Sequence, residues 1–202
     1  MKKLLFSILL FTVSFGLSAQ NMRTLFVEMP DSLLPLLSKI NREDCVDFLD
    51  ANMRARVTNV LGEESELLAF TDNYLHLKTS NSGVMQVKLL LCESDTVLCV
   101  VNTVSAEASS SRIAFYTPQW QQLNSDKYFT APRISDFIVE GDSADYYRSM
   151  ADIYLVEFSL SATSDSLKAG YTMPSYMLQE DSAKIVPHLK NLYYRWNGTR
   201  FE

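Results

Sequence analysis

Few side chains in this sequence could carry out acid–base or metal chemistry. The only imidazoles belong to His76 and His188. His76 alternates with Leu75 and Leu77, so we expect it to face away from both and toward solvent. The sequence has no Cys-x-x-Cys or His-x-x-x-His spacing, so we predict no metal site. It also lacks a Gly-x-Ser-x-Gly elbow, a Gly-rich phosphate loop and a dinucleotide fingerprint, so we predict no catalytic residue and no cofactor.

Carboxylates offer the remaining route to chemistry. Glu43, Asp47 and Asp50 fall near one face of an expected helix. A rigid helix cannot wrap its ligands around a hard cation, which favours a solvated acidic face over a cation site. Asp152 and Glu157 flank or lie in an expected strand and could serve a carboxylate-pair hydrolase. Nothing in the sequence fixes their separation.

The sequence holds three cysteines, so at least one must stay unpaired within the chain. Cys92 and Cys99 flank a hairpin connection at 93–96. A turn centred on Asp95 and Thr96 would place these two cysteines opposite each other as a disulfide candidate. A one-residue change of turn would remove that facing and leave two small buried residues instead. Cys45 lies among acidic residues in a helical segment, which is poor support for a nucleophile.

Aromatic side chains gather near the end of the chain, at positions 193, 194 and 196. On a strand, Tyr193 and Arg195 would face one way, and Tyr194 and Trp196 the other. Surfaces that combine aromatic rings with Arg are enriched at binding hot spots. The candidate binding residues are Tyr193, Arg195, Trp196 and the separate Trp120. The alternative is ordinary packing of both faces of the sheet.

The first residues of the chain are typical of an export signal. Lys2 and Lys3 precede an apolar run from residue 4 to 17, and Ala19 provides a small residue just before Gln20. We therefore predict a signal peptide over residues 1–19. The alternative is an uncleaved anchor, but the run is short for a helix that crosses a bilayer. No later stretch is long enough to span a membrane, so no span is expected after cleavage.

Composition narrows the class of protein. Of 202 residues, 47% are hydrophobic and 21% are charged, which suits a globular domain rather than a disordered chain. The formal net charge of -6 argues against nucleic acid as a partner, because a phosphate-binding surface needs a stripe of Lys and Arg. We expect residues 20–202 to form a single α+β domain. It could comprise two sub-halves that meet near the weakly patterned segment 121–141.

Two helices are predicted at the start of that domain. Asp31 can cap a helix that runs to Ile40, and Asn41 can cap a second one over 42–53. From Arg54 the pattern changes to strands joined by short turns, which implies an antiparallel meander. The expected strands cover residues 57–61, 67–70, 74–78, 84–91, 97–104 and 113–116.

The second half repeats the order of helix followed by strands. Asp142 or Ser143 can cap a short helix that runs to Met150. Further strands are expected at 153–160, 167–171 and 192–196, with a broken helix at 180–190 and a turn at Asn197-Gly198. The predicted fold is α+β. It comprises a mostly antiparallel, twisted β-sheet, an N-terminal helical hairpin and short helices on one face.

One short pattern recurs five times: Asp, then Ser or Thr, then a small or apolar residue. Asp-Ser pairs commonly begin helices and turns, which is the structural interpretation. The triplets also resemble the general protein O-glycosylation acceptor of gut Bacteroidales, which is used on exported proteins. That resemblance implies five candidate O-glycosylation positions: Ser32, Thr96, Ser143, Ser166 and Ser182.

Several segments together resemble a known family. They are the run from Trp196 to Phe201, Met29-Pro30-Asp31, the 95–103 hairpin and the stretch from Phe115 to Trp120. On these segments the chain is similar to a Bacteroidales-restricted family of small exported proteins of unknown function. The resemblance covers nearly the whole chain after the signal. It implies a location in the periplasm or on the outer surface of a Gram-negative bacterium, and it provides no active residue to transfer.

These observations favour an exported binding or accessory protein without catalysis. Its partner would be an unknown envelope protein or glycan. One alternative is a carboxylate-dependent hydrolase acting on envelope glycan or peptide. Another is a structural component of an envelope complex.

Overall fold

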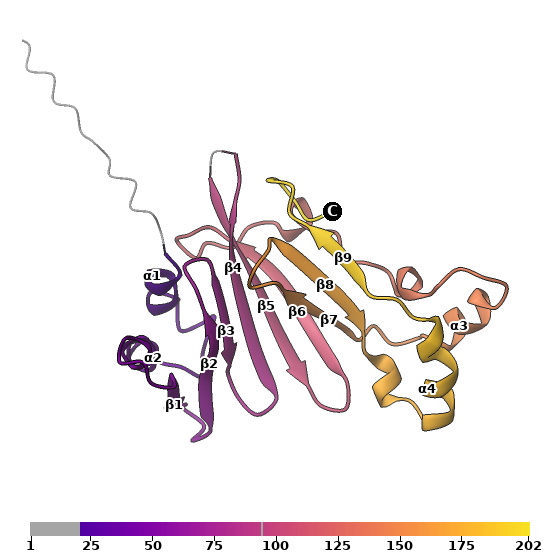
Figure 1. The fold of residues 1–202 in the computed structure, drawn as a ribbon, viewed down its shortest axis with the longest axis horizontal. Helices are drawn as coiled ribbons and strands as arrows, with labels where there is room; N and C mark the ends of the chain where they lie inside the picture. The colour runs from indigo at the N-terminus through magenta and orange to yellow at the C-terminus, as the bar shows by residue number, and fades with distance from the viewer. Residues whose placement is uncertain (1–20, 94) are drawn as a thin grey trace, which may run out of the picture.

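The computed structural model describes residues 21–93 and 95–202, and the predicted signal peptide at 1–19 lies outside them (Figure 1). The α-helices are α1 (Met22–Val27), α2 (Lys39–Asp50), α3 (Ala144–Met150) and α4 (Gln179–Ile185). The strands are β1 (Arg56–Thr58), β2 (Glu64–Phe70), β3 (Tyr74–Lys78), β4 (Gly83–Leu91), β5 (Thr96–Ser105), β6 (Ser109–Tyr116), β7 (Val156–Leu160), β8 (Ser166–Tyr171) and β9 (Leu192–Arg195). Short 3-10 helices lie at η1 (Ser125–Lys127), η2 (Ile134–Phe137), η3 (Met173–Tyr176) and η4 (Val186–His188).

The predicted α+β class and the antiparallel meander are confirmed. Strands β1 to β6 form one sheet in sequence order, each antiparallel to the next. The remaining strands, β7, β8 and β9, form a second antiparallel sheet of their own. Figure 1 shows this smaller sheet beside β6, at the opposite end of the large sheet from α1 and α2.

Both faces of the six-stranded sheet are buried. Met85 and Val87 point to the face that packs with α1 and α2. Leu90, from the same strand, packs on the other face with Phe158 and Leu167 of the small sheet. A strand covered on both faces lacks the alternation of apolar and polar residues that marks a solvent-facing sheet.

The small sheet docks through the edge of β7 as well as through apolar side chains. The backbone N–H of Phe158 donates to Ser111 Oγ at 3.0 Å, and that of Leu160 donates to Gln86 Oε1 at 2.9 Å. Both acceptors belong to side chains of the six-stranded sheet. A free strand edge invites pairing with other chains, and these bonds satisfy part of that edge internally.

The N-terminal pair of helices differs from the prediction. The helix expected over 31–40 does not form, and α1 lies earlier, with Asn21 as its N-cap. Helix α2 begins at Lys39 and is capped by Ser38, rather than by Asn41. Asp31 binds a buried arginine instead of capping a helix, because the segment between the helices is folded around that arginine.

The segment 121–141 contributes to the core despite its weak pattern. It contains η1 and η2, and its buried side chains pack with the small sheet. Phe129 makes edge contacts with Phe158 and Tyr194, with ring centroids 5.4 and 5.1 Å apart. Phe137 stacks on Tyr171 at 5.8 Å. Isolated aromatic anchors of this kind show no helical or strand period, so periodicity cannot find them.

A short return strand follows the predicted turn at Asn197-Gly198. Trp196 bridges to Phe201, and Arg195 exchanges backbone hydrogen bonds with Glu202 at 2.8 and 3.0 Å. Gly198 in the intervening turn has a φ of 93°, which glycine adopts more easily than other residues. This return strand covers one end of the free edge of β9.

No helix within residues 21–93 and 95–202 has the length and apolar character needed to cross a bilayer.

Candidate functional site

The outer face of the small sheet carries two of the predicted binding residues. Tyr193 and Arg195 are exposed, whereas Tyr194 and Trp196 pack inward, as the alternation predicted. Tyr193 is 70% exposed, which leaves most of its ring free for a partner. This strand therefore presents an aromatic ring and a guanidinium on one surface.

The neighbouring strand adds a second cation to this face. Exposed Lys168 lies opposite Tyr193, and half-buried Ser166 lies opposite Arg195. Within residues 21–93 and 95–202, neither Arg195 nor Lys168 makes an ion pair. The outer face of β8 and β9 is thus locally cationic on a chain whose formal net charge is -6.

A cleft of about 340 Å³ lies at the end of this face, between the β7–β8 connection and β9. We call it the Arg195 cleft. The residues that line it are Ser164, Asp165, Ser166, Arg195 and Trp196. The backbone N–H of Trp196 donates to the Asp165 carbonyl at 2.9 Å, which joins the two walls. The hydroxyls of Ser164 and Ser166 share a hydrogen bond of 2.8 Å.

Trp196 also lines the cleft, and contacts within the protein hold its indole in place. Its Nε1–H donates to the Leu91 carbonyl at 2.7 Å, across the junction with the large sheet. Its ring stacks on Tyr128 with centroids 6.2 Å apart and meets Phe201 edge-on at 5.3 Å. Contacts on several sides hold the ring in place before any ligand arrives, which lowers the entropy cost of binding.

The one carboxylate of the cleft is turned toward a different cation. Asp165 Oδ1 lies 3.5 Å from the ammonium of Lys88. That lysine is only 2% exposed, and its Nζ also donates to the Ser161 carbonyl at 3.2 Å. Because Asp165 offsets this buried charge, the guanidinium of Arg195 has no partner within the described part of the chain.

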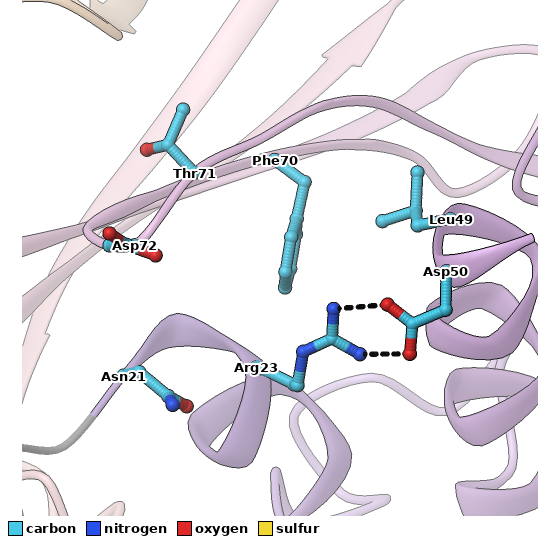
Figure 2. A pocket seen from close by; sticks show the side chains of 7 residues that line it. All are labelled: Asn21, Arg23, Leu49, Asp50, Phe70, Thr71 and Asp72. Atoms are coloured by element: carbon cyan, nitrogen blue, oxygen red, sulfur yellow. Dashed lines mark hydrogen bonds and ion pairs between the residues drawn. The ribbon is translucent and has the colours of Figure 1, made fainter. Parts of the chain in front are cut away.

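A second hollow, of about 290 Å³, lies between α1, α2 and the β2–β3 turn. Figure 2 shows two of its charged groups paired: the guanidinium of Arg23 makes two hydrogen bonds to the Asp50 carboxylate, at 2.8 and 2.7 Å. Asp50, expected on a solvated acidic face, thus belongs to a bidentate ion pair. Such a pair has little free capacity for a ligand, so this hollow is a weaker candidate than the Arg195 cleft.

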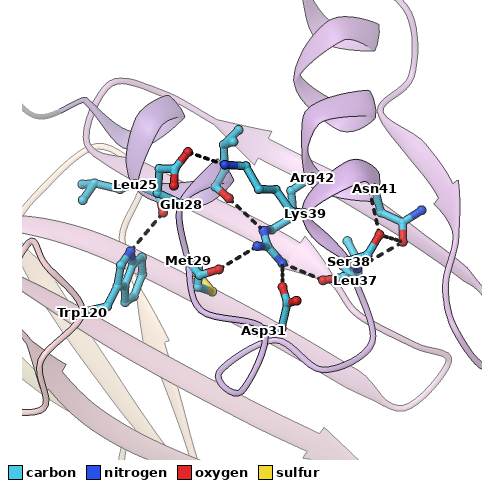
Figure 3. Close-up of polar contacts among 11 residues, drawn as sticks. Leu25, Glu28, Met29, Asp31, Leu37, Ser38, Lys39, Asn41, Arg42 and Trp120 are labelled. Atoms are coloured by element: carbon cyan, nitrogen blue, oxygen red, sulfur yellow. Dashed lines mark hydrogen bonds and ion pairs between the residues drawn. The ribbon is translucent and has the colours of Figure 1, made fainter.

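Arg42 is a buried cation with a structural role. It is 2% exposed, and its guanidinium donates to the carbonyls of Val27, Met29 and Leu37 and to the exposed carboxylate of Asp31 (Figure 3). All the acceptors lie between α1 and α2 or at their ends. Arg42 therefore fixes the path of the chain from one helix to the other.

Comparison with known proteins identifies the family. The family model described as "Protein of unknown function (DUF3256)" matches residues 14–201. The chain belongs to this family. A solved structure of a domain of an uncharacterized protein from Porphyromonas gingivalis W83 is similar to it, with a TM-score of 0.76 and 26% sequence identity. The match covers 89% of this chain and 96% of that one. No curated protein matches.

The predicted resemblance to a family of unknown function from Bacteroidales is confirmed, since Porphyromonas belongs to that order. The two descriptions assign no activity, ligand or partner. Function in this DUF3256 chain must therefore be argued from its own surfaces.

Trp120 does not share a surface with the other three candidates. It is 9% exposed and packs in the core beneath α1, where its Nε1–H donates to the Leu25 carbonyl at 3.1 Å. Its φ of 61° lies in the left-handed region, which is unusual for a bulky residue. Trp120 holds α1 against the sheet, and we do not include it in the candidate site.

The turn between β4 and β5 differs from the one that a disulfide would need. Cys92 donates its backbone N–H to the Asp95 carbonyl, and Cys99 lies opposite Lys88. Because Leu91 lies opposite Thr96, the turn is not centred on residues 95 and 96, and the two cysteines do not face each other. Both thiols, and that of Cys45, are free. Burial and the neighbouring charge of Asp95 raise the pKa of the Cys92 thiol.

The two histidines occupy different environments. His76 faces away from Leu75 and Leu77, as predicted, but it is half-buried under β7 rather than open to solvent. Burial lowers the pKa of its imidazole. His188 stacks on Tyr147 with ring centroids 3.9 Å apart.

The structure does not bring Asp152 and Glu157 to one place. Asp152 is exposed, and its charge adds to the effect of burial that raises the pKa of Tyr171 to about 12. Glu157 lines a groove between the sheets together with His76. Within residues 21–93 and 95–202, no three His, Cys, Asp or Glu side chains gather as a metal site would require.

Proposed function

We propose that the chain is an exported binding or accessory protein of the bacterial envelope, and that the Arg195 cleft holds an anionic group of its partner. The observation that carries the proposal is the exposed guanidinium of Arg195, which has no carboxylate partner in the described residues and lies in a cleft that Trp196 also lines. The partner is an envelope protein or glycan that bears a carboxylate, sulfate or phosphate.

The chemistry of the cleft supports an anionic ligand. A guanidinium offers a rigid fork of N–H donors that matches a carboxylate or phosphate. The hydroxyls of Ser164 and Ser166, which are hydrogen-bonded to each other, add polar groups beside it, and Trp196 completes the lining. Lys168 and Tyr193 extend the same surface along the sheet. Arg and aromatic residues together are the types that dominate binding energy at interfaces.

A crosslinking experiment tests this proposal. The full chain, tagged at Glu202, is expressed in its native host, crosslinked in intact cells and purified, and the captured material is analysed by mass spectrometry for proteins and glycans. We expect Arg195→Ala to lose at least nine-tenths of the specific capture. Arg112→Ala is the matched control, because Arg112 is an exposed arginine on the other sheet without an ion pair in the described residues. Equal capture by wild type and Arg195→Ala would refute the role of the cleft.

Export and glycosylation are parts of the same proposal with their own measurement. Among the five candidate hydroxyls, those of Ser32 and Ser143 belong to exposed residues, while Thr96, Ser166 and Ser182 are half-buried. An enzyme that attaches a glycan to a folded chain needs an exposed hydroxyl. We expect the intact mass of protein from native cells to match a chain that begins at Gln20 plus glycan. We expect Ser32→Ala and Ser143→Ala to remove most of that extra mass, and a mass equal to the bare chain would rule glycosylation out.

The alternatives receive less support. A carboxylate-dependent hydrolase needs two carboxylates at one site, and Asp152 and Glu157 lie apart. A structural component of an envelope complex would also use an exposed surface for contact. The crosslinking experiment separates this alternative, because such a contact need not depend on Arg195.

A further inference from the structure

A third concave surface lies where β7 crosses the face of the large sheet. We call it the inter-sheet groove. It has a volume of about 190 Å³, with His76 and Gln86 on one side and Glu157, Phe158 and Ser159 on the other. Because its walls come from different sheets, the groove exists only when the small sheet is docked.

Several polar groups of the groove are already satisfied within the protein. Gln86 donates to the Tyr74 hydroxyl at 3.0 Å and accepts from the Leu160 N–H at 2.9 Å. The hydroxyls of Thr103 and Ser105 pair with those of Ser111 and Ser109, at 2.7 and 2.9 Å. These groups form a fixed polar floor of the groove.

Three other groups face the groove without a partner. Within residues 21–93 and 95–202, the side chains of His76, Glu157 and Ser159 make no hydrogen bond or ion pair. The imidazole and the carboxylate come from opposite walls. Together they offer two carboxylate acceptors, one imidazole donor, one imidazole acceptor and a hydroxyl that can do either.

This set of free groups selects a class of ligand. Glu157 disfavours an anion. An ammonium ion would suit the carboxylate and could donate to the Ser159 hydroxyl, but it cannot accept the hydrogen bond that the imidazole N–H offers. Two adjacent hydroxyl groups can donate to both carboxylate oxygens and also accept from His76 and Ser159. Phe158 and Val84 supply apolar contact for the C–H groups of such a ligand.

The volume limits the size of the ligand. Sites for drug-sized molecules usually measure about 300–1,000 Å³. The groove is smaller than that, which fits one small polyhydroxylated unit. We propose that the inter-sheet groove binds a single saccharide unit through a vicinal diol, with Glu157 accepting from both hydroxyls and His76 donating to one of them. This site shares no lining residue with the Arg195 cleft and does not depend on it.

Histidine NMR provides the test. The chain from Gln20 onward is labelled with ¹³C-histidine, so His76 and His188 each give their own NMR signal. The variant His188→Gln shows which signal belongs to which histidine. Glucose, galactose and mannose are titrated as methyl glycosides. A single small unit should bind with a dissociation constant of about 1 mM. We expect at least one sugar to shift the His76 signal saturably and to leave His188 unmoved.

Four variants and two further probes make the result decisive. Glu157→Gln, which keeps the shape of the side chain, should weaken binding at least tenfold, and Ser159→Ala should weaken it less. Glu180→Gln, which alters an exposed carboxylate of α4, should bind as wild type does. Permethylated glucoside, which cannot donate a hydrogen bond, should give no shift of the His76 signal.

The proposal is overturned if no sugar shifts the His76 signal saturably, if Glu157→Gln binds equally well, or if ethylammonium shifts the His76 signal while the sugars do not. Arg195→Ala should leave the titration unchanged.

Discussion

Gln86 and Leu160, 74 positions apart in the chain, are joined by a hydrogen bond between the two sheets. Gln86 Oε1 accepts from the Leu160 backbone N–H at 2.9 Å, while Gln86 Nε2 donates to the Tyr74 hydroxyl at 3.0 Å. The Gln86 side-chain amide thus binds the backbone at the edge of the small sheet and a tyrosine side chain on the face of the large sheet. Apolar burial alone would let the small sheet slide, and this bond fixes where it docks.

Replacing Gln86 should destabilise the protein. In Gln86→Met the shape is nearly kept, but the buried N–H of Leu160 loses its acceptor. We expect a loss of about 1–3 kcal/mol in the free energy of unfolding, which is the cost of an unsatisfied buried polar group. Urea unfolding followed by circular dichroism measures it. Gln119→Met, at an exposed position, is the control and should change stability little. Equal stability of the two variants would contradict the role given to Gln86.

Arg42 and Asp31 should differ sharply in importance although they form one ion pair. Arg42→Met leaves three backbone carbonyls without their donor in a buried place, so we expect a loss of about 3 kcal/mol or more. The side chain of Asp31 is 69% exposed, so Asp31→Asn should lower the free energy of unfolding by less than about 1 kcal/mol. Thermal or urea unfolding of both variants tests this contrast. A large loss in Asp31→Asn would show that the ion pair matters more than the carbonyl contacts.

The three cysteines should react in a defined order. Burial raises the pKa of Cys45 to about 12, with a contribution from Asp44, and also raises the pKa of the fully buried Cys99. Cys92 is half-buried, so iodoacetamide at pH 8 should label it first in the folded protein. After unfolding without a reductant, mass spectrometry should show three labelled thiols. Only one labelled thiol would mean that two cysteines are bonded in solution.

Acidification should weaken the fold through His76. Burial lowers the pKa of this imidazole below its ordinary value of 6.5. The unfolded chain therefore takes up a proton that the folded chain resists, and stability falls as the pH drops below about 6.5. His76→Gln should reduce the slope of unfolding free energy against pH between pH 6.5 and the folded pKa. An NMR titration that places the His76 midpoint above 6.5 would reverse the expected sign.

Local pattern in the sequence predicted most strands and the class of the fold. The alternation from Tyr74 to Lys78 and the short turns after it fix an antiparallel meander, because parallel neighbours would need long crossovers. The same logic placed Tyr193 and Arg195 on one face and Trp196 on the other. The starts of the N-terminal helices were predicted less well than the strands. Asp31 looks like an N-cap in sequence, but the carbonyls around it bind Arg42, and that long-range contact decides the local structure.

What the sequence determined by itself is which residues share a face of one strand, since that depends only on the period of the backbone. It also determined membership in the family, whose model matches residues 14–201. Only the tertiary structure decided that β7 to β9 form a separate sheet, that Trp120 is buried under α1, and that His76 and Glu157 face one groove. These are contacts between segments far apart in the chain. Their geometry depends on how two sheets pack, and no local period encodes that packing.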